Sequence, residues 1–161
     1  MDDSTQAPRL DRIDRRILRA LTADGRISWS DLAQEVGLSV TPTLRRVRQM
    51  EESGLIRGYT AKIDATRLLG PIPVFISITM GRQVSGALEI FESAIEKIPE
   101  IMGGYLMSGG NDYMLHAFVR SLDHYRELLE KLTRIELIGH IQSSFVLKSF
   151  LQRPAPLLGD D

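Results

Sequence analysis

The spacing of apolar residues changes halfway along this chain of 161 residues, and that change limits the possible folds more than any other feature. From Leu10 to Ser53 apolar residues recur every three or four positions, which predicts amphipathic helices. From Val74 to Leu147 several short segments alternate between apolar and other residues, which predicts strands with one buried face. We therefore expect an α+β protein with a helical part followed by a mixed part.

The helical part is predicted to hold three short helices. The first ends at Gly25, and the second opens after a variant capping box over 28–31. Gly37 then allows a tight turn, and the third helix runs from about Val40 or Thr41 to Ser53. Two helices joined by a short glycine turn are the helix-turn-helix pattern, whose second helix enters the DNA major groove.

The third helix has the surface that such a recognition helix needs. Three arginines and no acidic residue lie between Thr41 and Met50, so a local basic patch exists although the net charge is −1. Polar side chains on the outward face can read bases, and arginines at its rims can bind phosphates. The predicted DNA contacts are Ser39, Thr41, Thr43, Arg45, Arg46, Arg48 and Gln49. The alternative is an ordinary three-helix bundle that binds protein.

The second part follows a β-α-β-β-α-β order, which predicts a ferredoxin-like sheet. Strands are expected over 74–80, 101–107, 113–119 and 141–147, with helical stripes after the first and third. The predicted division is a DNA-binding unit with a linker strand or wing over 1–64, a hinge over 65–71, the ferredoxin-like domain over 72–151, and a tail over 152–161. A sheet with helices on one face leaves the other face open, so we expect a homodimer in which a second sheet covers it.

Composition excludes several classes of protein. The absence of cysteine excludes disulfide scaffolds and thiol chemistry, and three dispersed histidines do not indicate a metal site. No apolar run approaches the roughly 20 residues of a membrane span, and the acidic start does not resemble a signal peptide. We expect no cofactor, no membrane partner, and a cytoplasmic, nucleoid-associated location.

Several motifs resemble the Lrp/AsnC (leucine-responsive, feast/famine) regulators. They are Leu10-Asp11-Arg12-Ile13-Asp14-Arg15-Arg16-Ile17-Leu18, Asp24-Gly25-Arg26-Ile27-Ser28, Val36-Gly37-Leu38-Ser39, Gly54-Leu55-Ile56 and Ser108-Gly109-Gly110-Asn111-Asp112. The resemblance implies a winged-helix-like helix-turn-helix domain, a RAM sensing domain that binds an amino acid between dimers, and assembly to octamers. By position it implies these effector contacts: Leu106, Gly109, Asp112, Leu122, Ser144, Phe145 and Val146.

Asp112 is the most informative of these residues. Its carboxylate can pair with the ammonium of a free amino acid, while N–H groups of the preceding turn bind the carboxylate. The alternative is that Asp112 only caps the hairpin. This chain departs from many relatives at Gly110-Asn111 and has Ser143-Ser144 in its last strand, so the resemblance does not identify leucine as the effector.

Two other interpretations stay open from the sequence. Siroheme decarboxylases share the two-domain build, but His116, His124 and His140 are not clustered with lysine or arginine as a tetrapyrrole site would require. A stand-alone amino-acid sensor, or an architectural DNA-binding protein without an effector, is the other possibility. No nucleophile–base pair, phosphate loop or metal motif is present in the sequence.

Overall fold

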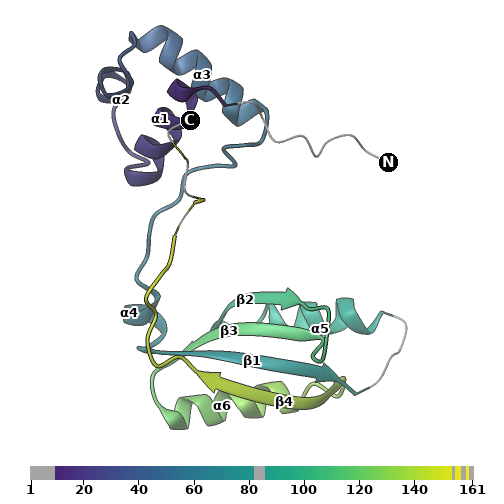
Figure 1. Cartoon of the computed structure of the whole chain (residues 1–161). Helices are drawn as coiled ribbons and strands as arrows, with labels where there is room; N and C mark the ends of the chain where they lie inside the picture. The colour runs from purple at the N-terminus through teal and green to yellow at the C-terminus, as the bar shows by residue number, and fades with distance from the viewer. Residues whose placement is uncertain (1–9, 82–85, 154, 157–158, 160–161) are drawn as a thin grey trace. The chain divides into compact units, whose positions relative to one another are not determined.

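The computed structural model describes residues 10–81, 86–153, 155–156 and 159 (Figure 1). The chain divides into two compact units. The first contains the N-terminal residues up to Lys62 together with the C-terminal segment from Leu151, and the second spans Ile63–Phe150. Each unit has its own buried core.

The first unit consists of helices α1 (Arg12–Ala23), α2 (Trp29–Val36) and α3 (Val40–Glu52), as the apolar spacing predicts. Ser28 caps α2 by accepting a hydrogen bond from the Asp31 N–H. Gly37 has a φ of 76°, a left-handed conformation that suits glycine because it lacks a Cβ atom. The helices meet over a core of Ile17, Ala20, Leu32, Val36, Val47 and Met50.

The segment after α3 differs from the predicted wing or linker strand. Residues 57–64 are irregular and contain no strand. A strand needs a neighbour to pair its N–H and C=O groups, and the described part of this unit contains no other strand. Tyr59 is instead fixed by a hydrogen bond of 2.9 Å from its hydroxyl to Glu51 Oε1.

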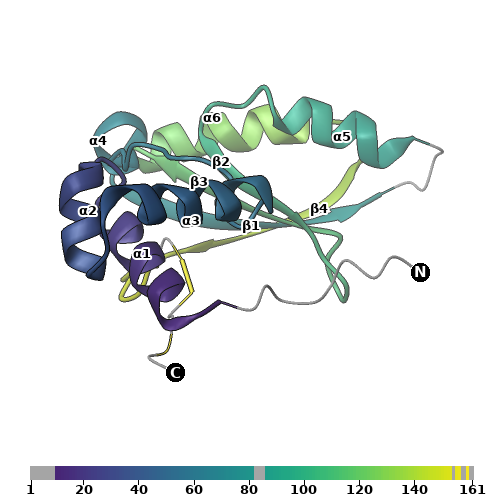
Figure 2. The ribbon, with the colours of Figure 1, turned by 90° about the horizontal axis from the view of Figure 1, so that it is seen from above.

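The second unit contains a four-stranded antiparallel sheet in the order β2-β3-β1-β4. Its strands are β1 (Ile72–Met80), β2 (Ile101–Leu106), β3 (Tyr113–Val119) and β4 (Ile138–Phe145). Helices α5 (Ala87–Ile95) and α6 (Leu122–Thr133) lie on the same side of this sheet (Figures 1 and 2). The predicted ferredoxin-like fold is confirmed.

The alternation along β1 creates two different faces. Val74, Ile76 and Ile78 are fully buried under the helices, in a core that includes Phe91 and Leu128. The side chains between them belong to the opposite face, which the described helices leave uncovered. On that open face Phe75 of β1 stacks on His116 of β3, and His116 in turn contacts Phe118.

The predicted hinge over 65–71 has a defined structure. Residues Ala65–Leu69 form a short helix, α4, which belongs to the second unit and contacts β3. Gly70 lies so close to β3 that a Cβ atom would come within 2.5 Å of the Val119 and Arg120 backbone. The irregular connection between the units therefore lies before α4, in residues 57–64, rather than in the predicted hinge.

Candidate nucleic-acid interface and effector region

The outward face of α3 carries a polar and cationic surface. Thr41, Leu44, Arg45, Arg48, Gln49 and Glu52 line one concavity of about 570 Å³. Except for Leu44, which is half-buried, these side chains are exposed, while Val47 and Met50 on the other side of the helix are buried. A single α-helix fits the major groove, so this face can present its hydrogen-bonding side chains to base edges.

Ser39 immediately precedes α3 and is exposed. It is the N-cap residue of α3, but its side chain makes no capping hydrogen bond. Its carbonyl oxygen accepts hydrogen bonds from the Thr43 N–H and the Thr43 hydroxyl. Ser39 is thus an exposed polar residue at the start of α3, two positions before the exposed Thr41.

Thr43 is one of the predicted DNA contacts, and the structure corrects this prediction. Its side chain has no exposed surface, and its hydroxyl donates a hydrogen bond of 3.0 Å to the Ser39 carbonyl. Thr43 lies one turn before Val47 and two before Met50, on the face that packs into the core. This spacing from Val47 and Met50 already indicates in the sequence that Thr43 is buried. The hydroxyl group suggests a surface residue instead, which led to the wrong prediction.

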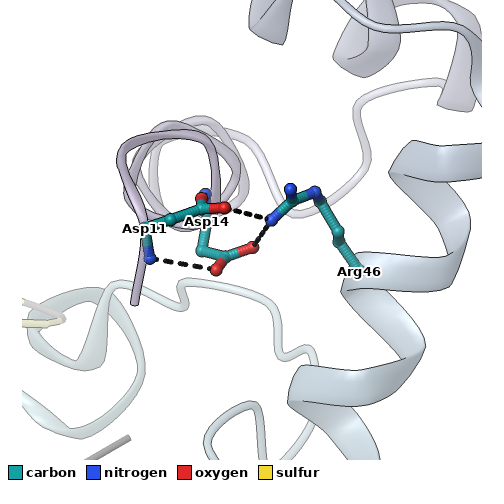
Figure 3. Close-up of polar contacts among 3 residues, drawn as sticks. All are labelled: Asp11, Asp14 and Arg46. Atoms are coloured by element: carbon teal, nitrogen blue, oxygen red, sulfur yellow. Dashed lines mark hydrogen bonds and ion pairs between the residues drawn. The ribbon is translucent and has the colours of Figure 1, made fainter. Parts of the chain in front are cut away.

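Arg46 also differs from its predicted role as a phosphate contact. Its Nη1 donates to Asp11 Oδ2 and to Asp14 Oδ1, each at 2.7 Å (Figure 3). The guanidinium is held between these two carboxylates of α1, and the contact raises the pKa of Arg46. We therefore assign Arg46 to the contact between α1 and α3 and leave it out of the DNA surface.

The two aspartates form the start of α1. Asp11 accepts from the Asp14 N–H and Asp14 accepts from the Asp11 N–H, which is a reciprocal capping box. The hydrogen bond from the Asp14 N–H is the largest cause of the lowered pKa of Asp11, and the Arg46 side chain adds to it. Sequence reasoning missed this group, although two acids three residues apart at a helix start were its visible sign.

Asp112 has three hydrogen-bonding contacts at the end of the β2–β3 turn. Its Oδ2 accepts from the Met80 N–H at 2.6 Å, its own N–H donates to the Ile78 carbonyl, and its carbonyl accepts from the Met107 N–H. These bonds tie the turn to the end of β1. Asp112 therefore does cap the hairpin, as the alternative interpretation of this residue expects. Its other carboxylate oxygen, Oδ1, has no hydrogen bond to a described residue.

The predicted effector residues form two groups within one chain. Asp112 lies at the Met80 end of β1, whereas Phe145 is paired with Val74 near its other end. Val74 and Met80 are six residues apart, or about 20 Å along a strand. One group is Leu106, Gly109 and Asp112, and the other is Leu122, Ser144, Phe145 and Val146.

The second group does not share one face either. Ser144 is paired with Phe75 on the open face, whereas Phe145 points to the helix side and packs edge-on against Tyr125, with ring centroids 4.9 Å apart. Leu122 begins α6 and is 64% exposed. A single chain therefore does not bring the seven predicted residues around one ligand.

Comparison with known proteins shows which protein families the two units resemble. Residues 10–57 match the family model for a winged helix-turn-helix DNA-binding domain, and residues 73–156 match that for the Lrp/AsnC ligand binding domain. The Bkd operon transcriptional regulator of Pseudomonas aeruginosa is 49% identical over 150 residues, covering 92% of this chain and 98% of the relative. The leucine-responsive regulatory protein of Escherichia coli K12 is 41% identical over 155 residues, covering 94% of each chain.

Solved structures agree with these matches. A transcriptional regulator of Neisseria meningitidis in complex with L-Met superposes with a TM-score of 0.85 at 31% identity, covering 92% of this chain and 96% of that one. An AsnC family regulator of Agrobacterium tumefaciens gives a TM-score of 0.84 at 32% identity, covering 92% and 97%.

A helix-turn-helix unit joined to a ligand-binding domain defines a DNA-binding transcriptional regulator, not an enzyme. The chain belongs to the Lrp/AsnC family. The predicted family, fold and regulatory class are confirmed, and the decarboxylase alternative is set aside. None of the helices in the described ranges is long and apolar enough to cross a membrane.

Proposed function

We propose that this regulator reads specific DNA sequences with α3 and that a free amino acid modulates its binding. The main support for this proposal is the exposed surface of α3, on which Thr41, Arg45, Arg48 and Gln49 lie around one concavity. Arg45 and Gln49 offer bidentate hydrogen bonds to bases, Arg48 offers a phosphate contact at the rim, and Ser39 offers a hydroxyl at the helix start.

The proposed regulator is a homodimer that forms through the open face of the sheet. Phe75 is 39% exposed on that face, and it stacks on His116 next to Phe118. Covering these rings with the same face of a second chain would remove apolar surface from water. A dimer would also present two copies of α3, which suits an operator with two half-sites.

We place the amino-acid site between chains. The two groups of predicted effector residues lie toward opposite ends of the sheet, so residues of one group can meet those of the other only across an interface. Asp112 Oδ1 would bind the ammonium, and Leu106 and Phe145 would contact the side chain. Assembly of dimers into an octamer would create such interfaces.

The comparisons support an amino-acid effector without identifying it. One group of relatives carries the name leucine-responsive regulatory protein, and the Neisseria meningitidis structure is an L-Met complex. We propose an amino acid with an apolar side chain for this chain, because its candidate contacts Leu106, Leu122, Phe145 and Val146 are apolar. A cytoplasmic, nucleoid-associated location follows from the proposed role.

A screen with two readouts tests the function. A ligand that binds only the folded state raises the unfolding temperature, so the twenty amino acids are screened by thermal shift, and each positive one is then added to a DNA-binding assay. We expect at least one to change affinity for the DNA upstream of a regulated gene. If none of the twenty amino acids changes the unfolding temperature or the DNA affinity, the proposed amino-acid effector is wrong. If the protein binds all DNA sequences equally, the proposed sequence-specific binding by α3 is wrong.

Assembly has its own test. The fragment 63–150 corresponds to the second unit, including α4. We expect it to elute as a dimer or a larger species at micromolar concentration. A well-folded monomer would contradict dimer formation through the sheet.

A further inference from the structure

A groove of about 460 Å³ runs between β2, at one edge of the sheet, and α5. Its apolar lining includes Phe91, Ile95, Ile101, Leu106 and Leu115. Gly104 has no side chain and leaves the groove open beside Leu115. Among the described strands β2 pairs only with β3, so the N–H and C=O groups along its outer side have no strand beside them. Such an edge can accept an added strand from another chain.

The wall of this groove on α5 is acidic. Glu92 and Glu96 lie four residues apart at the end of that helix, and both line the groove. Glu92 Oε1 accepts a hydrogen bond of 2.8 Å from the Tyr113 hydroxyl, which holds its carboxylate in place. Neither glutamate forms an ion pair with a described residue. The groove therefore suits an extended chain that carries both apolar side chains and a cation.

The segment that follows β4 has these properties. Residues 147–150, with the sequence Leu147-Lys148-Ser149-Phe150, belong to no helix or strand. Leu147 is 99% exposed and Phe150 is 86% exposed. The segment contains no acidic residue, and Lys148 forms no ion pair with a described residue. In an extended conformation Lys148 and Phe150 point to the same side, because side chains alternate along a strand.

This segment cannot lie along β2 of its own chain. The strands β4 and β2 are the opposite edges of the sheet, three strand spacings or about 14 Å apart (Figure 1). Four extended residues span at most about 14 Å. A segment that crossed the sheet would have no length left to run along β2. It can therefore reach this groove only in a second copy of the chain.

We propose that residues 147–150 of one chain bind along β2 of a second chain as an added strand. Lys148 pairs with Glu92 and Glu96, and Phe150 enters the apolar groove. Main-chain hydrogen bonds to β2 supply affinity, and the two side chains supply specificity. Burial of Phe150 also removes apolar surface from water. The contact uses one edge of the sheet, so it is separate from the proposed dimer through the open face and can join such dimers.

Cross-linking between two different chains tests this contact. The parent has no cysteine, so Met102→Cys in the groove and Ser149→Cys in the segment each introduce a single thiol. The two full-length proteins carry tags of different mass, are expressed together, and are treated with a short bismaleimide, which allows either strand direction. We expect several-fold more mixed product than from Ser149→Cys with Glu127→Cys, an exposed position on α6. Equal yields from the two pairs would overturn the proposal.

A charge exchange separates specific binding from chance collision. In the chain that supplies the groove, Glu92→Gln with Glu96→Lys should reduce the mixed product several-fold, and Lys148→Glu in the other chain should then restore it. Glutamine at position 92 keeps an acceptor for the Tyr113 hydroxyl. Glu89→Lys, on α5 but outside the groove, is the control and should leave the yield unchanged. Thermal unfolding confirms that each variant folds. No recovery in the exchanged pair would overturn the proposal.

Discussion

His116 stacks on Phe75 with ring centroids 4.7 Å apart and an angle of 17° between the rings. The two residues face each other across β3 and β1 on the open side of the sheet. Burial among these rings lowers the pKa of His116 from its usual value of 6.5. A neutral imidazole is therefore the form that the folded protein favours.

The first prediction follows from the sign of that shift. Below pH 6.5 the unfolded chain takes up a proton at His116 more readily than the folded chain, so the free energy of unfolding falls as pH falls. His116→Phe should keep the stacking and reduce this loss. Urea unfolding of parent and variant at pH 7.5 and 5.5, at equal protein concentration, checks it. An equal loss in both proteins would show that His116 makes no contribution.

The second prediction concerns Arg46. Arg46→Ala should lower the free energy of unfolding by about 1 kcal/mol, because it removes partly exposed ion pairs with Asp11 and Asp14. The slope of DNA affinity against salt should stay near that of the parent. Arg48→Ala is the matched control and should reduce the slope by about 0.9 without a change in stability. If Arg46→Ala reduces the slope of DNA affinity against salt, Arg46 does contact DNA phosphates.

The third prediction concerns base reading by Arg45. Arg45→Ala should weaken binding to the preferred duplex by about 1–3 kcal/mol and relax the preference at one base pair in each half-site. Binding of a randomised duplex library by both proteins measures this. Equal weakening on every sequence would make Arg45 a phosphate contact.

The fourth prediction concerns a buried carboxylate at the start of β2. Glu100 is 5% exposed, and its Oε1 accepts from Lys131 Nζ at 2.5 Å and lies 3.1 Å from His124 Nε2. Glu100→Gln should cost about 2 kcal/mol of stability, since it removes the charge that Lys131 binds. Exposed Glu127→Gln is the control and should be neutral. Equal stability of the two variants would contradict a role for this contact.

The same group should influence stability in acid. Burial opposes ionisation of Glu100, but hydrogen bonds led by that from Lys131 outweigh it and leave its pKa below the usual 4.5. The contribution is therefore present above pH 4.5 and disappears as pH falls below that value. The Glu100→Gln variant should lose less stability than the parent between pH 5 and pH 3.

The fifth prediction separates the two roles of Asp112. Asp112→Asn keeps an acceptor for the Met80 N–H, so stability should be nearly unchanged, but the affinity for the amino acid found in the screen should fall about ten- to hundredfold. Asp112→Ala should lose about 1–2 kcal/mol of stability as well. Calorimetric titration and thermal unfolding give the two quantities. Unchanged amino-acid affinity in Asp112→Asn would leave only the structural role.

Periodicity predicted most of the fold because each element has a clear apolar pattern. The strand expected over 113–119 has those bounds in the structure, and α3 ends one residue before the expected Ser53. Helix α4 was not predicted because its five residues are too few to show a helical period. The expected strand after Gly54 had the right residue types but no neighbouring strand among the described residues of its unit.

The site was harder to predict because its contacts join distant parts of the chain. Arg46 is 35 residues from Asp11, so its helical position alone could not reveal the ion pair. The effector residues came from a resemblance in linear sequence, which does not give the pairing of residues between strands. Within the β2-β3-β1-β4 order, the register of β4 places Phe145 beside Val74, whereas Asp112 binds Met80 at the other end of β1.

That strand order also has a practical consequence. Both β2 and β4 have one hydrogen-bonded neighbour each, and β2 displays Met102, Tyr105 and Leu106, which are each more than half exposed. Open strands with apolar side chains can pair with foreign strands and start aggregation. The open edge of β2 is therefore the part of the sheet at which we expect pairing with foreign strands, and hence aggregation, to begin.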